Sequence, residues 1–229
     1  MAISLIDELA ALRLVTGFGD PVFLLSAAAA LFLYLRRRRL RNVAFAWGGA
    51  IVLCGALSAA AKLGFQTCGG DVGGLQIRSP SGHAALAVIF YGGAAVLLGR
   101  GRPLLARCGI GLAAVLLIAG IAVSRVVLGM HSAAEVVSGG LIGLATLAVF
   151  ATLTAQSRGA ALPLGPAVVL VAVVGFVTWG LHVDVERVIA GISRRFQSVA
   201  DLCMPDLRAA VRPGLREESA GPLLGRSGQ

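Results

Sequence analysis

Charged and aromatic residues are scarce in this chain. Charged residues make up 14% of its 229 residues, aromatic residues make up 6%, and Lys62 is its single lysine. Soluble domains carry about 25% charged residues, so this composition excludes an ordinary soluble fold. A nucleic-acid-binding protein needs a basic face with interleaved aromatic residues, and no such face is visible here. We therefore expect no nucleic-acid partner.

The chain also lacks the cysteine spacing of metal centres and redox sites. Its four cysteines form no CxxC pair and no Cys/His cluster. No internal repeat is visible, and many transporters are built from inverted repeats. Neither a cysteine-based metal centre nor a transporter of that type is indicated.

Apolar residues, by contrast, make up 57% of the chain, and the mean hydropathy is +0.87. A helix needs about 20 predominantly apolar residues, and at least about 17, to cross a bilayer. Six apolar stretches meet or approach that length, near residues 20–35, 43–61, 83–99, 104–124, 133–155 and 162–181. The sequence therefore predicts an all-α, polytopic membrane bundle of six transmembrane helices over residues 20–182. Glycines such as Gly92–Gly93 and Gly139–Gly140 favour close helix packing within it.

The two ends of the chain differ from this central domain. Residues 1–19 carry charges among apolar residues at near-helical spacing and lack the order of a signal peptide, which predicts an amphipathic interfacial segment. Residues 184–202 alternate apolar and charged residues at helical spacing, and the stretch from Arg212 is rich in glycine and proline. We therefore predict an interfacial helix and a flexible tail over residues 183–229.

Arginine accounts for nearly all the positive charge behind the net charge of +9. Arginines crowd alternate short loops, at Arg36–Arg39, Arg100–Arg107 and Arg158. An excess of Lys and Arg in short loops marks the cytoplasmic side. The intervening loops, which hold the motifs below, should then face the periplasm or exterior of a bacterial-type inner (plasma) membrane. The arginine-containing tail after His182 does not fit this pattern, so its side stays open.

A first candidate motif is Arg78-Ser79-Pro80-Ser81-Gly82-His83. Ser79 can cap a helix whose first residue is Pro80, a position that suits proline. The first-turn amides from Ser81 to His83, with the positive end of the helix dipole, would form an anion site that Gly82 lets a phosphate approach closely. An ordinary Ser-Pro helix start with an interfacial histidine explains this motif equally well when it is taken alone.

A second motif joins Ser124-Arg125 to His131 and Glu135. We expect His131 to begin a helix, with Glu135 four residues later on the same face. A carboxylate beside an imidazole fixes its tautomer and prepares the other nitrogen as a nucleophile or base. Arg125 offers a fork of donors that matches phosphate oxygens. The alternative is a purely structural His–Glu pair.

Lys62 ends the second apolar stretch in a chain that otherwise uses arginine. A compact ammonium there suits a phosphate, and a snorkelling interfacial cation is the alternative. Polar groups of this kind need a functional or pairing reason to lie near hydrocarbon. Taken together, the motifs favour phosphoryl transfer at a membrane surface. One carboxylate and two separated histidines do not form a Mg²⁺ or Zn²⁺ cage, so we expect no metal and no other cofactor.

At these residues the chain resembles the type 2 phosphatidic acid phosphatases, membrane lipid phosphatases related to vanadium haloperoxidases. Their pattern is Lys-x6-Arg-Pro, then Pro-Ser-Gly-His, then Ser-Arg-x5-His-x3-Asp. Pro80–His83 matches the second part, and Ser124, Arg125 and His131 match the third. The chain departs at Gly69–Gly70, where the family has Arg-Pro, and at Glu135, where it has Asp.

The resemblance implies a role for each matching residue. His131 would attack phosphorus and form a phosphohistidine, while Glu135 holds and polarises it. His83 would protonate the leaving oxygen and then activate water. Oxygen-binding roles fall to the remaining motif residues, which are Lys62, Ser81, Gly82 and Arg125. Arg78 is our hypothesis for a replacement of the missing arginine.

The expected activity is hydrolysis of a lipid phosphate monoester or diphosphate. The expected partners are this lipid substrate and the lipids of the membrane. Polyprenyl diphosphate, phosphatidate, phosphatidylglycerophosphate and lipid A phosphates all stay open as substrates. Two alternatives also stay open. One is a phosphotransferase of the same fold, and the other is a catalytically inactive lipid transporter or binding protein, which the missing arginine makes plausible.

Overall fold

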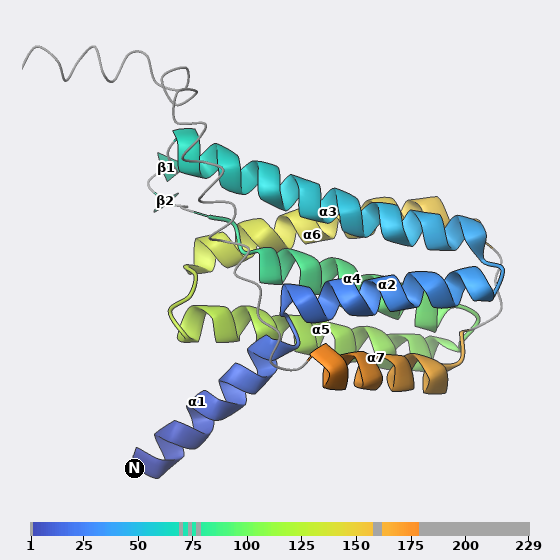
Figure 1. Ribbon diagram of the computed structural model, residues 1–229, viewed down its shortest axis with the longest axis horizontal. Coiled ribbons are helices and arrows are strands. Elements are labelled where there is room, and N and C mark those ends of the chain that lie inside the picture. Colours follow the sequence, from blue (N-terminus) through green and yellow to red (C-terminus); the bar gives the residue numbers. More distant parts are fainter. Residues whose placement is uncertain (1, 69–70, 73–74, 77–78, 158–161, 179–229) are drawn as a thin grey trace, which may run out of the picture.

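The computed structural model describes residues 2–68, 71–72, 75–76, 79–157 and 162–178. Helices account for nearly all of this part of the chain, and a short antiparallel hairpin pairs Asp71 with Gln76 and Val72 with Leu75. Figure 1 shows the helices gathered into one bundle, from which α1 projects. The elements in order are α1 (Ala2–Gly17), α2 (Pro21–Arg37), α3 (Arg41–Cys68), β1 (Asp71–Val72), β2 (Leu75–Gln76), α4 (Gly82–Gly99), α5 (Leu104–Val127), α6 (Ala133–Thr154) and α7 (Leu164–Thr178).

The predicted all-α membrane bundle is confirmed. Five helical segments of the described chain are long and apolar enough to cross a membrane, namely Ala10–Arg37, Arg41–Phe65, Gly82–Gly99, Leu104–Val127 and Ala133–Thr154. The sixth predicted stretch forms α7, whose apolar part, Val168–Thr178, is shorter. Many large apolar side chains point outward, such as Leu105 at 85% exposure and Phe176 at 87%. Such surfaces suit contact with lipid rather than water.

The predictions for the two ends of the chain have different outcomes. Residues 2–17 form α1, whose end meets α5, because a Cβ on Gly120 would lie 3.4 Å from Cγ1 of Val15. The interfacial position of residues 1–19 stays a prediction. The predicted interfacial helix and tail over residues 183–229 lie outside the described residues.

Helix α4 lies at the centre of the bundle and packs against α2, α3, α5 and α6. In lipid, helices are held together by packing and hydrogen bonds rather than by the hydrophobic effect. Trp47 of α3 supplies both kinds of contact: its ring packs on Phe90 of α4 and Phe150 of α6, and its Nε1 donates to the carbonyl of Ala28, 3.0 Å away. This buried side chain therefore ties four helices together.

Small residues let α6 approach the backbone of α4. A Cβ built on Gly143 would lie 2.6 Å from the carbonyl oxygen of Ala85 and 2.7 Å from Cβ of Val88. One turn earlier, a Cβ on Gly139 would collide with the carbonyl oxygen of Ser81. The glycines thus bring the first turns of α4 and α6 together, and these turns carry the candidate motifs.

Consecutive long helices run up and down, which sorts the charged residues between the two ends of the bundle. The α2–α3 and α4–α5 turns hold Arg36–Arg39 and Arg100–Arg102, and they lie at one end. The starts of α4 and α6 and the end of α5 lie at the other end, as Figure 1 shows. The arginine-rich end and the motif end are therefore opposite each other.

Candidate active site

Residues from three helices and one turn meet at the motif end of the bundle. Lys62 comes from α3, His83 from the first turn of α4, Arg125 from the last turn of α5, and His131 from the turn before α6. Arg125, His131 and Lys62 all lie close enough to His83 to interact electrostatically with its ring. These residues are distant in the sequence, so only the folded bundle brings them into one cluster.

Glu135 connects the second motif to the first. Its Oε2 lies 3.1 Å from Nδ1 of His131, and its Oε1 accepts a hydrogen bond from the backbone N–H of Ser79 at 2.9 Å. The backbone carbonyl of Glu135 accepts from the N–H of Ser81 at 2.8 Å. One residue of α6 therefore holds both the histidine and the stretch of chain that leads into α4.

The His131–Glu135 contact determines which nitrogen of the imidazole carries the proton. A carboxylate only accepts hydrogen bonds, so Nδ1 of His131 carries the proton and donates to it. Nε2 then keeps its lone pair. Both side chains are buried, at 8% exposure each, which strengthens the electrostatic contact between them. The arrangement can present a nitrogen nucleophile or base of fixed orientation.

The start of α6 differs from our expectation. His131 was expected to begin the helix, whereas α6 begins at Ala133 with Ser132 as its N-cap. Oγ of Ser132 accepts from the N–H of Glu135 at 3.2 Å, and Oε2 of Glu135 accepts from the N–H of Ser132 at 3.0 Å. This is a capping box. The Ser-x-x-Glu spacing is a sequence signal for such a cap, and a helix start at His131 disregards that signal.

The start of α4 also differs. Ser79 was expected to cap a helix beginning at Pro80, whereas Ser81 is the N-cap and α4 begins at Gly82. Ser81 Oγ accepts from the N–H of Ala84 at 3.4 Å, and the N–H of Ser81 is taken by the carbonyl of Glu135. In the first turn, the amides of Gly82 and His83 remain for an anion, because helix geometry gives them no intrahelical acceptor. Ser81 thus positions these amides, and its predicted role in binding phosphate oxygens stays a prediction.

Lys62 lies beside those amides. A Cβ on Gly82 would be 3.8 Å from Cε and 4.0 Å from Nζ of Lys62, and Lys62 is only 6% exposed. Helix α3 continues beyond Lys62, the end of the second apolar stretch, to Cys68. Lys62 is therefore held by helical backbone on both sides. The ammonium group therefore lies close to the backbone of Gly82.

Arg125 shapes the turn between α5 and α6. Its carbonyl accepts from the N–H groups of Met130 and His131, at 3.0 and 3.2 Å, and its Nη1 lies 2.7 Å from Sδ of Met130. Gly129 closes the turn with φ of 66°, a left-handed conformation that glycine adopts without strain. Arg125 is 8% exposed, so a buried guanidinium lies directly before the His131 turn.

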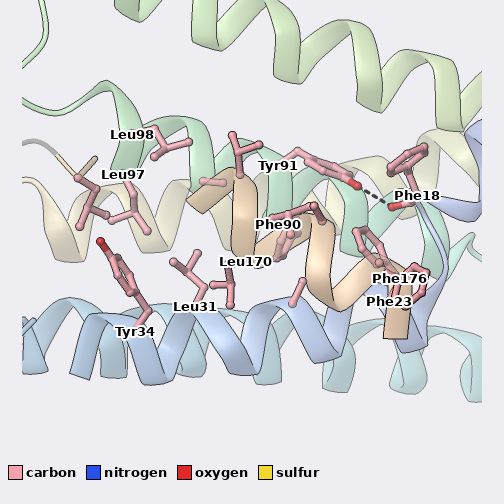
Figure 2. Close-up of a pocket in the computed structure, with 17 residues that line it drawn as sticks. Phe18, Phe23, Leu31, Tyr34, Phe90, Tyr91, Leu97, Leu98, Leu170 and Phe176 are labelled. Atoms are coloured by element: carbon pink, nitrogen blue, oxygen red, sulfur yellow. Dashed lines mark hydrogen bonds between the residues drawn. The ribbon is translucent and has the colours of Figure 1, made fainter. Parts of the chain in front are cut away.

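An apolar cavity of about 550 Å³ runs between α2, α4 and α7. Phe18 lines one end, and the neighbouring Gly19 packs near His83, since a Cβ there would lie 3.7 Å from Cδ2 of the ring. Figure 2 shows Phe18, Phe23 and Phe176 at this end and Leu97, Leu98 and Tyr34 at the other. The hydroxyl of Tyr91 donates to the carbonyl of Phe18 at 2.7 Å and ties α4 to the turn before α2 at this end of the cavity.

Comparison with known proteins identifies the family of this arrangement. The PAP2 superfamily matches residues 57–159, a range that contains Lys62 and both histidine motifs. A protein of Klebsiella pneumoniae named "Uncharacterized 22.5 kDa protein in cps region" is 35% identical over 148 residues, which cover 62% of this chain and 68% of that protein. The chain belongs to the PAP2 superfamily. No solved structure matches it.

Membership of the PAP2 superfamily confirms the resemblance seen in the sequence. Members of the family are phosphatases, and a multi-pass helical protein of this family is consistent with lipid phosphatases in general. The roles of the individual residues stay predictions. Two positions of interest lie outside the described residues: Arg78, and Gly69–Gly70, where other PAP2 proteins have Arg-Pro.

The hydrogen bonds of Glu135 lead to a prediction. Glu135→Gln is expected to lower kcat at least about a hundredfold, because an amide keeps only one accepting oxygen and would point its NH₂ group either at the N–H of Ser79 or at the N–H of Ser132 and Nδ1–H of His131. Glu135→Asp is expected to keep measurable activity. It retains the charge but is one methylene too short to reach Ser79 and His131 together. Phosphate release by the purified variants, at equal folded fraction, would measure both effects. Equal activity of the two variants and the unmodified protein would remove this role.

Proposed function

We propose that this PAP2 protein is an integral-membrane lipid phosphatase that works without a metal ion, through a phosphohistidine intermediate, on the extracytoplasmic face. The observation that carries the proposal is the buried His131–Glu135 pair, 3.1 Å apart, whose carboxylate also holds Ser79. It lies in a cluster with Lys62, His83 and Arg125. An oriented imidazole beside several cationic groups is what attack on a phosphate ester requires.

In the proposed reaction, Nε2 of His131 forms a bond to phosphorus while the bond from phosphorus to the lipid oxygen breaks. His83 gives its proton to the departing lipid oxygen. His83 then takes a proton from water as the water oxygen attacks phosphorus and the P–N bond breaks, which releases inorganic phosphate and restores both histidines. General acid–base help of this kind contributes about 10²–10⁴-fold in rate.

The cationic groups around the cluster would supply the charge stabilisation. Lys62 and Arg125 carry formal charges, and the amides of Gly82 and His83 add the positive end of the α4 dipole. Donors that are already in place when charge develops on the phosphate oxygens need no reorganisation during the reaction. This set supports charge stabilisation by protein groups.

The apolar cavity supports a lipid as the substrate. Its volume of about 550 Å³ is within the range of ligand pockets, and Phe18, which lines one end, adjoins the glycine that packs near His83. A lipid whose phosphate lies at the histidines would place its hydrocarbon chain along α2, α4 and α7. The arginine-rich turns at the opposite end of the bundle support an extracytoplasmic position for the histidines.

Phosphate release in the presence of a chelator tests this function. We expect the purified protein in detergent with EDTA to release phosphate from long-chain lipid phosphates. Ala94→Phe, which places a ring in the cavity, is expected to raise KM for a long-chain substrate about tenfold, corresponding to about 1.4 kcal/mol of lost packing. The same variant should hydrolyse a short-chain, water-soluble phosphate ester as fast as the unmodified protein.

The matched control is Ala113→Phe, which adds the same ring to an exposed position of α5 away from the cavity. It should leave both substrates unaffected. Equal KM values for Ala94→Phe and Ala113→Phe would contradict binding of the chain in this cavity. Transfer of phosphate to another lipid without release would indicate a phosphotransferase, and inertness toward every substrate would indicate a binding protein.

A further inference from the structure

A second cavity, of about 690 Å³, lies at the arginine-rich end of the bundle. It is formed by the end of α4, the first turns of α5 and the end of α6. None of the motif residues lines it. Its place at the opposite end of these helices separates it from the candidate active site, so the proposed phosphatase reaction does not account for it.

Small residues create the space. Gly99, Gly111 and Ala151 line the cavity from the three helices, one from each. A Cβ built on Gly111 would meet no atom within 4 Å, so this glycine faces open volume. Apolar groups, including those of Val96 and Leu104, form about half of the walls around it. A ligand here must therefore have an apolar part.

Two arginines, Arg100 and Arg107, are the charged residues of the lining, which also contains Thr154 and Ser157. Nη2 of Arg100 donates to the carbonyl of Thr154 at 2.9 Å, which fixes the guanidinium at the end of α6. The stem of Arg107 packs over Gly99, with Cγ 3.6 Å from the position of a Cβ there. Among the described residues that line the cavity, none is acidic. The lining therefore carries positive charge beside an apolar wall.

We infer that this cavity binds the headgroup of an anionic phospholipid, with the phosphodiester at Arg100 and Arg107 and the start of the acyl chains against Gly111. The membrane-spanning helices end at this level, where Leu104 and Leu105 are 72% and 85% exposed, so lipid headgroups lie beside the opening. Basic pockets between transmembrane helices on the cytoplasmic side are a recurrent binding site for anionic headgroups. The rule that positively charged loops face the cytoplasm accounts for the arginines, but it does not account for a cavity between them.

Binding of phosphatidylglycerol tests the inference. The full chain would be purified in neutral detergent and titrated with phosphatidylglycerol or phosphatidylcholine, and bound lipid would be counted by native mass spectrometry. Phosphatidylglycerol is expected to bind at least about fivefold more tightly, because each arginine near an anionic headgroup contributes about 1 kcal/mol. Glycerol 3-phosphate should not compete at equal concentration, since it has no acyl chain for the apolar wall.

Two glycines of α5 provide matched variants. Gly111→Leu fills the cavity and should remove the preference for phosphatidylglycerol, whereas Gly109→Leu adds the same side chain where open space surrounds the helix and should keep it. Arg107→Gln should weaken binding about fivefold. Equal binding of phosphatidylglycerol by both leucine variants would overturn the proposal, as would full competition by glycerol 3-phosphate.

Cys108 offers a second measurement that needs no substitution. It is exposed and lines the cavity, so an alkylating reagent can reach it. Phosphatidylglycerol should slow alkylation of Cys108, followed by peptide mass spectrometry, while phosphatidylcholine should not. An alkylation rate that is the same with both lipids would contradict occupancy of this cavity, whatever the leucine variants do.

Discussion

His131→Ala is expected to lower kcat for phosphate release at least about a thousandfold, with the protein still folded. The reason is chemical: the side chain removed is the one whose Nδ1 is held by Glu135, so no other described residue can present a nitrogen in the same orientation. Glu135 would lose one contact but keep its bonds to the backbone of Ser79 and Ser132. The local structure should therefore survive the change.

The variant His83→Gln distinguishes the role of the nucleophile, His131, from the role of the acid–base catalyst, His83. It keeps His131 and should still accept a phosphoryl group from a substrate with a good leaving group, but it lacks the base for hydrolysis. A ³²P-labelled substrate should therefore label the His83→Gln protein on His131, as an acid-labile and base-stable phosphohistidine. The His131→Ala protein should take up no label under the same conditions.

The control is His182→Ala, which removes the remaining histidine of the chain and lies in neither motif. It should release phosphate at an unchanged rate, and thermal unfolding of all three variants should confirm that each is folded. Labelling of His131→Ala, or a His131→Ala rate within about tenfold of the unmodified protein, would show that this imidazole is not the nucleophile.

The sequence was sufficient to predict a bundle of membrane-spanning helices, because apolar runs of bilayer length leave few alternatives to a helical bundle. It also placed the charged motifs at helix ends, since hydrocarbon excludes such groups from most other positions. The His131–Glu135 contact followed from their four-residue spacing, which brings side chains together locally. Local periodicity and spacing can be read from a single segment, without knowing which other segments pack against it.

Contacts between segments that are distant in the sequence could not be predicted from periodicity and spacing. Glu135 binds the backbone of Ser79, 56 residues earlier, and this bond holds Ser79 outside α4, whose N-cap is Ser81. No spacing in the sequence encodes that partner. The two cavities likewise exist because of how three helices pack at each place, and neither could be inferred from any one segment.

Gly139→Ala is expected to lower kcat about a hundredfold and to destabilise the protein by about 1–3 kcal/mol. A Cβ at this position would collide with the carbonyl oxygen of Ser81 and lie 3.0 Å from its nitrogen, and the backbone there cannot rotate away as a flexible side chain could. The collision would push the first turn of α4 from α6 and strain the bond from Ser81 N–H to the carbonyl of Glu135. A displacement of about 1 Å can cost about a hundredfold in rate.

Gly140→Ala is the matched control, because it makes the same change one residue later, where nothing lies within 4 Å. It should keep full activity and gain up to about 1 kcal/mol of stability from the better helix propensity of alanine. Phosphate release and thermal unfolding of the two variants measure the difference directly. If Gly139→Ala and Gly140→Ala behaved alike, the close approach of α6 to Ser81 would not be what holds His83 and His131 within reach of the same phosphorus.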